Sequence, residues 1–319
     1  MYSDLQESDI ELLIQEPKIH SVQFYEFKTP STETWQVLAQ FFRQYPQIGL
    51  RISWYDEVDF SFLTHVPSVK KFAVSSFLTK DFSSIPRYLD LEELSLGETK
   101  SISVKTDFIA SCNNLKRFYN DGMKKGLEVL SDLPYLASLT LRGVKMADLT
   151  FLENLQHLKE LRLLFGSYKS ASSLSKLKQL ELLEISRTRQ IPDYDFLLDL
   201  VNLQTLCFEG MSNMEVLPNL RNLDKLTKIQ IDNNRRLTDI SSVAQLKNLK
   251  TLLLFFPENV KAAVKKDLMK QAKDILSRSR TIASTNLWSV MNDEERKVLK
   301  QKNIEFWGYH PAVEQVFRQ

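Results

Sequence analysis

The stretch Leu237–Phe255, which reads LTDISSVAQLKNLKTLLLF, decides the fold. Its apolar side chains recur in four steps of three and then one step of two, at Ile240, Val243, Leu246, Leu249, Leu252 and Leu254. Steps of three fit a tight or irregular helical turn, and a step of two fits a strand, in which alternate side chains share a face. The same ladder ends at Ile229 and Ile231, 23 positions earlier, so the stretch is one unit of a repeat.

The step of two marks a strand in every unit and can be followed along the chain. The pairs are Leu50/Ile52, Phe72/Val74, Leu94/Leu96, Phe118/Asn120, Leu139/Leu141, Leu161/Leu163, Leu183/Ile185, Leu206/Phe208, Ile229/Ile231 and Leu252/Leu254. Successive pairs are 21 to 24 residues apart, and a period of about 20–29 residues is typical of a leucine-rich solenoid. With n as the first residue of each pair, we predict that n and n+2 point into the core.

The pattern L-x-x-L-x-x-L-x-x-L-x-L over residues 46–256 resembles the leucine-rich repeat proteins with short repeats of about 22 residues, typified by internalins. The resemblance implies an α/β fold: a leucine-rich repeat solenoid with a curved parallel β-sheet on the concave side, short turns or 3₁₀/α segments on the convex side, and helical end caps. The family's Asn, three residues after the last strand leucine, is kept at Asn234. Other units replace it with Thr99, Val144, Gly166, Thr188, Met211 and Pro257.

The ends of the chain do not follow the repeat. We expect residues 1–45 to form an N-terminal cap, residues 46–256 the array, and residues 257–319 a C-terminal helical cap with a final strand. In the first cap, residues 19–27 alternate like a strand, and Pro30 opens a helix through Tyr45 with Thr29 as its N-cap.

The predicted C-terminal cap contains two helices. Residues 257–280 have apolar side chains at regular steps of four, which indicates an amphipathic helix. Asn292 or Asp293 caps a second helix, and the last strand is expected to place Ile304 and Phe306 inward.

Composition limits the possible partners and the compartment. The 319 residues are 43% hydrophobic with a formal net charge of +2, which gives no overall basic field to attract nucleic acid or a membrane. The acidic N-terminal sequence does not resemble a signal peptide, and no apolar run is long enough to span a membrane. Cys112 and Cys207 lie four units apart, roughly 19 Å, which is too far for a disulfide. We therefore expect a cytoplasmic protein with reduced thiols.

No pattern of catalytic residues stands out. Five aspartates each precede a strand residue by 13 positions: Asp59, Asp81, Asp148, Asp193 and Asp239. An Asp at the entrance to a helical turn accepts a bond from backbone N–H, so capping explains this column better than a nucleophile or metal ligand does. The four histidines occur singly, and no phosphate-binding loop is present. We expect no enzyme activity, no cofactor and no metal.

The register predicts which side chains face a partner. If n and n+2 point inward, n+1 and n+3 point out from the concave face and n+4 borders it. The residues expected to bind a partner are Trp54, Tyr119, Arg142, Arg162, Phe165, Glu184, Arg187 and Glu209. Aromatic and arginine side chains are typical of binding hot spots, but a solvated surface with ion pairs such as Arg162–Glu184 is the alternative. Leu253, Phe255 and Phe256 are expected to lie under the C-terminal helices.

The sequence favours a non-catalytic scaffold that binds another protein on its concave face. The alternative is a cytosolic inhibitor, such as a bacterial immunity protein, that occludes a toxin or enzyme. An enzyme or a nucleic-acid-binding protein fits the sequence less well, and we expect neither a nucleic-acid nor a membrane partner. The partner's identity and the oligomeric state stay open.

Overall fold

The computed structural model describes residues 5–15, 19–25, 30–101 and 103–307. The chain divides into two compact units, residues 1–177 (unit 1) and 178–319 (unit 2). The division falls inside the predicted repeat array, so each unit contains several repeats. The predicted cap boundaries at residues 45/46 and 256/257 stay predictions.

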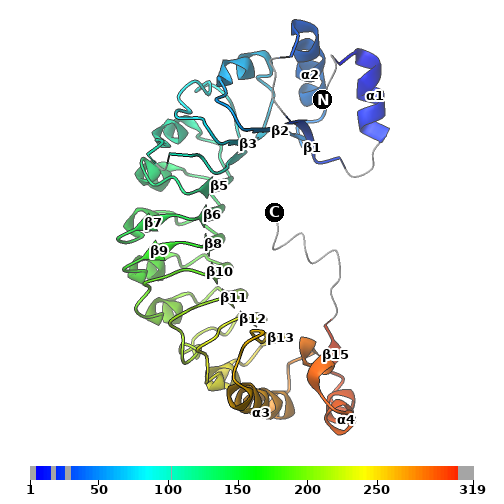
Figure 1. The fold of residues 1–319 in the computed structure, drawn as a ribbon, viewed down its shortest axis with the longest axis vertical. Helices are drawn as coiled ribbons and strands as arrows, with labels where there is room; N and C mark the ends of the chain where they lie inside the picture. Colours follow the sequence, from blue (N-terminus) through cyan, green and yellow to red (C-terminus); the bar gives the residue numbers. More distant parts are fainter. Residues whose placement is uncertain (1–4, 16–18, 26–29, 102, 308–319) are drawn as a thin grey trace. The chain divides into compact units, whose positions relative to one another are not determined.

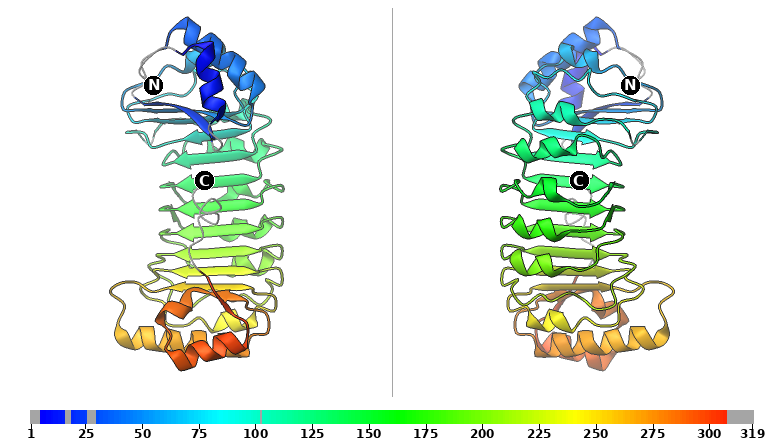
Figure 2. Two further views of the ribbon diagram at one scale, coloured as in Figure 1. Left: turned by 90° about the vertical axis from the view of Figure 1, so that its right-hand side faces the viewer. Right: turned by 90° about the vertical axis from the view of Figure 1, so that its left-hand side faces the viewer.

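Unit 1 is built on a parallel sheet, with its strands side by side in Figures 1 and 2. In sheet order the strands are β1 (Ser21–Tyr25), β2 (Gly49–Trp54), β3 (Lys71–Ser76), β4 (Glu93–Leu96), β5 (Arg117–Asp121), β6 (Ser138–Arg142) and β8 (Glu160–Leu164). A separate short pair is formed by β7 (Lys145–Met146) and β9 (Ser167–Tyr168). The 3₁₀ turns are η1 (Phe60–His65), η2 (Asp107–Ser111), η3 (Leu127–Asp132), η4 (Thr150–Leu152) and η5 (Ser172–Lys176), and the helices are α1 (Glu7–Gln15) and α2 (Thr32–Gln44).

Unit 2 continues the same pattern of strands and turns. Its parallel strands are β10 (Leu182–Ser186), β11 (Thr205–Glu209), β12 (Lys228–Asp232), β13 (Thr251–Phe255), β14 (Ser284–Thr285) and β15 (Glu305–Phe306). Its turns and helices are η6 (Asp195–Asp199), η7 (Ser241–Gln245), η8 (Asn286–Val290), α3 (Ala262–Arg278) and α4 (Asp293–Gln301). Among the described residues, every helix is too short or too polar to span a bilayer.

The core confirms the predicted register. Both members of every n/n+2 pair are buried, and equivalent residues face one another across neighbouring strands, as Leu139 does with Leu161 and Leu206 with Ile229. Asn120 is the polar member, and its side-chain amide donates to the carbonyl oxygen of Met123 at 2.7 Å. Each repeat therefore buries one apolar ladder, which stacks on the ladder of the next repeat.

The aspartate column caps the turns, as predicted. Each carboxylate accepts a hydrogen bond from the backbone N–H two residues on, at 3.0 Å for Asp59, 2.9 Å for Asp81, 3.1 Å for Asp148, 3.3 Å for Asp193 and 2.7 Å for Asp239. The Ser61 amide holds the pKa of Asp59 below its usual range, and the Thr150 hydroxyl does the same for Asp148. These hydrogen bonds give the column a structural role.

Asn234 satisfies backbone groups of the preceding repeat. Its side-chain oxygen accepts from the Met211 amide at 2.7 Å, and its side-chain nitrogen donates to the Phe208 carbonyl at 3.0 Å. Asn234 is buried, so these two bonds take the place of the bonds that water would otherwise make to the backbone groups. The amide kept from the repeat pattern thus ties one turn to its neighbour.

The helices α2 and α4 begin close to where the sequence placed them, whereas α3 begins at Ala262, five residues after the predicted start at Pro257. Ser31 is the N-cap of α2 and accepts from the Thr34 amide at 3.1 Å, while the expected cap Thr29 lies outside the described residues. Asn292 and Glu295 form a capping box at α4, as expected for Asn292. Phe306 is 57% exposed, which contradicts its predicted inward position. It lies on β15, which pairs with β14 and has no strand on its other side within the described part of the chain.

Asn286 extends the pairing beside β13 after β14 ends. Its side-chain oxygen accepts from the Leu254 amide at 2.9 Å, and its side-chain nitrogen donates to the Leu254 carbonyl at 3.0 Å. The turn η8 packs against β13, and Leu253 is fully buried. Leu253 is therefore covered as expected, although by the turn η8, whereas Phe255 and Phe256 stay partly exposed.

Candidate protein-binding surface

The candidate surface is the outer sheet face, formed by the n+1 and n+3 side chains and bordered by n+4. In unit 1 it includes Tyr119 in the middle of β5, Arg142 at the end of β6 and Phe165 directly after β8, on neighbouring strands. Trp54 lies at the end of β2, three strands before β5, so it does not join this cluster. In unit 2 the surface includes Glu184, Arg187 and Glu209.

Asp121 links the polar side chains of the unit 1 cluster. Its carboxylate accepts a hydrogen bond from Arg142 Nη1 at 2.7 Å and from the Tyr119 hydroxyl at 3.3 Å. Burial and the neighbouring Asp121 charge raise the pKa of Tyr119 to about 12, so its hydroxyl stays protonated at neutral pH. For Arg142, burial acts to lower the pKa, but the Asp121 hydrogen bond and charge outweigh it and raise the pKa.

Arg142 also contacts the aromatic ring of Phe165. The guanidinium carbon lies 5.1 Å from the ring centroid, which is within range for a cation–π interaction. Phe165 is 44% exposed, a large fraction for an aromatic side chain. Tyr119, Asp121, Arg142 and Phe165, called the Arg142 cluster below, therefore combine a fixed cation, a fixed carboxylate and an open apolar surface.

Phe165 occupies an unusual backbone position. The n+4 residues in several repeats have left-handed φ angles: 84° at Gly122, 67° at Gly143, 55° at Phe165, 48° at Arg187, 60° at Gly210 and 52° at Asn233. Glycine and asparagine adopt this conformation most readily, whereas a β-carbon makes it unfavourable by roughly 1–2 kcal/mol. Phe165 and Arg187 are therefore strained where equivalent turns carry Gly or Asn.

Arg162 differs from its predicted role. It is only 6% exposed, because its side chain lies along the sheet and Nη1 donates to Glu160 Oε2 on the same strand at 3.1 Å. Glu160 also accepts from the Ser138 hydroxyl at 3.0 Å on the neighbouring strand. This burial leaves Arg162 little surface for a partner to contact, and its role in partner binding stays a prediction. Thr140, Cys207 and Leu253 are n+1 residues that are buried as well.

In unit 2, Arg187 and Glu209 form the centre of the outer face. Arg187 Nε lies 3.2 Å from Glu209 Oε1, and the Ser186 hydroxyl donates to the other carboxylate oxygen at 2.9 Å. A β-carbon on Gly210 would lie 2.8 Å from Arg187 Cγ, so glycine leaves room for the arginine. The ion pair is partly exposed, which keeps the guanidinium accessible to a partner.

The strands beside this pair carry further acidic groups. Burial, together with the charge of Glu209, raises the pKa of Asp232 on β12. Burial also raises the pKa of the Cys207 thiol, and nearby Glu184, Glu209 and Asp232 reinforce the effect. Unit 2 therefore presents an acidic face around Arg187, whereas the Arg142 cluster of unit 1 combines charge with an aromatic ring.

Sequence reasoning missed Asp121 as a member of the site. Its n+3 position on β5 was the available signal, because Arg142 is the n+3 residue of the neighbouring strand and faces it directly. It also missed the left-handed turn position. That signal was the recurrence of Gly122, Gly143 and Gly210 four residues after each strand start.

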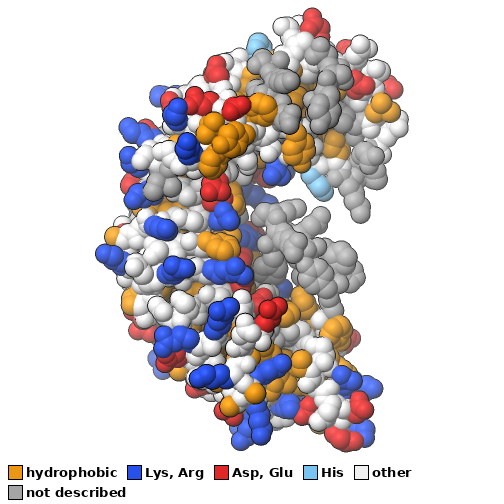
Figure 3. All heavy atoms as spheres, in the orientation of Figure 1, with side chains coloured by type: hydrophobic (Ala, Val, Ile, Leu, Met, Phe, Trp, Pro, Cys, Tyr) orange, Lys and Arg blue, Asp and Glu red, His pale blue; other side chains and the backbone are white. Residues whose placement is uncertain are grey.

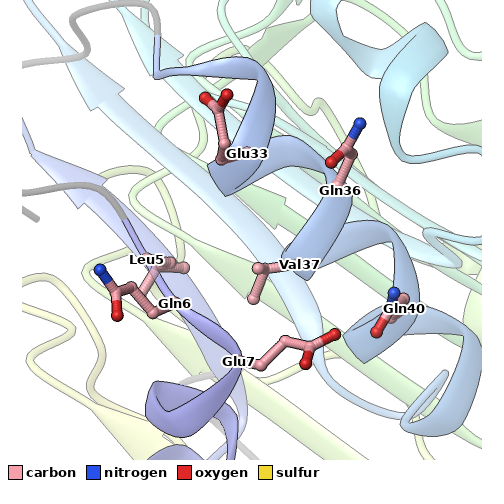
Figure 4. Close-up of a pocket in the computed structure, with 7 residues that line it drawn as sticks. All are labelled: Leu5, Gln6, Glu7, Glu33, Gln36, Val37 and Gln40. Atoms are coloured by element: carbon pink, nitrogen blue, oxygen red, sulfur yellow. The ribbon is translucent and has the colours of Figure 1, made fainter.

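Catalytic and metal chemistry find little support in the described ranges. No three His, Cys, Asp or Glu side chains there gather closely enough to hold a metal ion. A pocket of about 480 Å³ lies between α1 and α2, and Figure 4 shows its wall. Its lining consists of Leu5, Gln6, Glu7, Glu33, Gln36, Val37 and Gln40. These side chains include no nucleophile paired with a base.

Comparison with known proteins supports the fold. No protein-family model and no curated protein sequence matches the chain. An internalin, InlF from Listeria monocytogenes, is similar in structure with a TM-score of 0.58 and 18% identity, covering 94% of this chain and 86% of that one. Internalin C2 from the same organism has a TM-score of 0.49, 21% identity and coverage of 60% and 83%. The plant peptide hormone receptor RGFR1, solved in complex with RGF2, has a TM-score of 0.48, 14% identity and coverage of 76% and 43%.

Of these three, InlF has a TM-score above 0.5, and at this identity the likeness establishes the fold alone. Together with the repeat period, the buried n/n+2 ladders and the parallel strands, it identifies the architecture. The chain is a leucine-rich repeat solenoid of the short, internalin-like repeat class.

Proposed function

We propose that the protein is a non-catalytic scaffold that binds another protein through its outer sheet face, with the Arg142 cluster of unit 1 as the main contact. One observation carries the proposal. Phe165 is exposed and takes a strained φ of 55° at a position where the turns of the two preceding repeats have glycine, Gly122 and Gly143. A strained, exposed aromatic residue lowers stability without filling the core, and strain of this kind clusters at functional sites.

The chemistry of the cluster fits protein recognition. Tyr119 and Arg142 are residue types that dominate binding hot spots. The Asp121 carboxylate and the Phe165 ring hold Arg142 in place, so little side-chain entropy is lost when a partner binds. An ordinary solvated surface would need no such fixed arrangement, because exposed ion pairs contribute only about 0–1 kcal/mol each.

The test is a comparison of captured proteins from the native lysate. Wild-type protein and the double variant Arg142→Glu/Phe165→Gly are immobilised, and bound proteins are quantified by mass spectrometry. We expect one protein to be enriched by the wild type and lost by the double variant, because the variant removes both the cation and the ring. Purified partner would then be titrated by calorimetry to measure the affinities.

The matched control is Lys178→Glu, which changes an exposed cation paired with Asp199 at 2.7 Å, away from the outer face. It should keep the partner. Equal capture by wild type and the double variant, with loss in Lys178→Glu, would show that a different surface binds.

Two finer proposals follow from the same scaffold. An inhibitor that occludes a toxin or enzyme would use the same face, and the purified partner would lose its own activity when bound. We also propose a cytoplasmic location, which the two free, buried thiols support.

A further inference from the structure

The loops that follow β4, β5, β6 and β8 in unit 1 carry a row of exposed lysines. We call this row the lysine edge, and its members are Lys100, Lys105, Lys124, Lys125, Lys145 and Lys169. Figure 3 shows Lys and Arg side chains gathered over the loops near β7 and β9, whose positions Figure 1 labels. The row lies beside the strand ends that carry the Arg142 cluster.

The lysine edge lacks ion pairs, unlike the opposite edge of the same sheet. Within the described part of unit 1, none of the six lysines forms an ion pair. On the opposite edge, Lys116 pairs with Glu92 at 2.6 Å, and Lys70 pairs with Asp90. Lys105 does lie close enough to Asp81 for its charge to help lower the pKa of that carboxyl, but no ion pair forms there. Most of the charge of the lysine edge therefore has no neutralising partner within the described part of unit 1.

The backbone brings two of these lysines together. Lys105 and Lys125 lie opposite each other in a parallel bridge, where like charges are destabilising. The same loops carry Glu98, Asp107 and Asp148, fewer acids than lysines. The Asp148 carboxylate already accepts hydrogen bonds from the Thr150 amide and hydroxyl. The loops thus hold a net positive charge that an anionic partner would relieve.

We propose that the lysine edge binds an acidic, extended segment of the protein partner, next to the contact made by the Arg142 cluster. This inference rests on the proposed function and names the chemistry of the partner. Phe165 offers an apolar contact beside the lysines, so the fitting segment combines carboxylates with an apolar side chain. Complementary charge of this kind speeds association and selects the partner.

The composition of the edge favours protein over other polyanions. None of the six positions is an arginine, and Arg142 beside them is already paired with Asp121. Tyr168, next to Lys169, is fully buried, and the exposed Phe165 is a single ring where successive bases need several. A membrane surface would need apolar side chains around the cations. Phe165 is the one strongly exposed large apolar residue of these turns in the described chain, which is too little to enter a bilayer.

The test measures binding of three polyanions to the full chain at one low ionic strength. The probes are labelled poly-L-glutamate, labelled duplex DNA and phosphatidylserine vesicles, followed by fluorescence anisotropy for the first two and by cosedimentation for the third. We expect poly-L-glutamate to bind best and to dissociate as salt is added, because salt screens exposed charges. Tighter binding of DNA or vesicles, or no binding of poly-L-glutamate, overturns the inference.

The variant Lys125→Ala/Lys145→Ala/Lys169→Ala should lower affinity for poly-L-glutamate by about tenfold or more. The matched control is Lys70→Ala/Lys71→Ala/Lys116→Ala, which removes the same charge from cations that are already paired. Equal losses in the two variants overturn the inference. Because this assay uses poly-L-glutamate and not the partner, its failure is separate from that of the proposed function, which the Arg142→Glu/Phe165→Gly capture experiment decides.

Discussion

Arg142 lies over the ring of Phe165, with 5.1 Å between its guanidinium carbon and the ring centroid, although Phe165 holds a left-handed backbone angle that favours glycine. The cation–π contact contributes about 0.5–1 kcal/mol at an exposed site, which is no more than the backbone strain costs. The stability that this contact contributes therefore does not explain why phenylalanine stands at this position. We propose that recognition of a partner does.

The stabilities of Phe165→Gly and Phe165→Ala should differ in the direction opposite to the usual one, in which alanine is more stable than glycine. Both variants lose the ring, but at a φ of 55° only glycine avoids the clash of a β-carbon. We expect the glycine variant to be more stable than the alanine variant by about 1 kcal/mol, measured by urea unfolding.

Ser95, on β4 of the same sheet, provides the control for this pair. There, Ser95→Gly should be less stable than Ser95→Ala by about 0.5–1 kcal/mol, because glycine weakens an ordinary strand. Gly143→Ala offers a second check: its β-carbon would lie no closer than 3.5 Å to another atom, so a loss of about 1 kcal/mol would come from φ alone. An alanine at 165 as stable as glycine would show that the turn is not strained.

Leu161→Ala should destabilise unit 1 by about 2–5 kcal/mol. Leu161 is fully buried and lies opposite Leu139 of the preceding repeat, so the truncation leaves a cavity in the stacked ladder. Leu206→Ala tests the equivalent position in unit 2, where Leu206 is also fully buried. A melting temperature within about a degree of wild type in either variant would contradict the register.

Arg162→Glu and Arg142→Glu should separate fold from binding. Arg162 is buried beside Glu160, so a glutamate there would place two carboxylates together and lower stability by about 2 kcal/mol or more. Arg142 is partly exposed, and its reversal should change stability less while abolishing partner binding. Thermal unfolding and calorimetry measure the two effects. Similar stability losses in both variants would place Arg162 on the open surface after all.

Asp232→Asn should stabilise the protein at neutral pH. Burial first, and then the charge of Glu209, raise the pKa of Asp232 in the folded state. Its ionised form therefore lowers the free energy of unfolding as pH rises through that raised pKa, and the loss is absent below the unfolded value of about 3.9. The variant should exceed wild type in stability at pH 7, with the gap closing as the pH approaches 4. A difference in stability between the variant and wild type that widens toward low pH would contradict the raised pKa of Asp232.

The two thiols should resist modification in the native protein. Burial raises the pKa of Cys112 to about 11 and also raises the pKa of Cys207, so little thiolate forms at pH 8. A thiol reagent should therefore react slowly with the folded chain and rapidly with both cysteines after unfolding without reductant. Recovery of no free thiols after unfolding would contradict the proposed cytoplasmic location.

The repeat made the core predictable, whereas exposure on the outer face was harder to predict. The step of two at Leu161 and Leu163 places both side chains inside because strand side chains alternate. The same rule places Arg162 outside the core, yet a long side chain can lie flat on the sheet, and its bond to Glu160 cannot be read from alternation. Phe306 shows the matching failure at the edge of the sheet, where alternation sets a side but little of the described chain covers it.

The turns were predictable where a side chain caps the backbone. Asp59 and Asp239 were assigned correctly, because a carboxylate at a turn entrance has a local partner two residues on. The left-handed angle at Phe165 was not predicted, because phenylalanine itself gives no sign of it. Only the glycines at the same place in other repeats could have indicated it.

The amide of Asn286 has a consequence for assembly. An open strand edge is a template on which a second chain can add a strand. At β13 the two-residue strand β14 occupies the first part of this edge, and the Asn286 side chain takes both backbone groups of Leu254. The short strand β14 and the Asn286 side chain, which bonds as the backbone of a strand would, together occupy the hydrogen-bonding edge of β13 that another molecule would need. Asn286 therefore closes this edge of β13 to strand addition, which leaves β15 as the edge strand of the sheet at this end of the described chain.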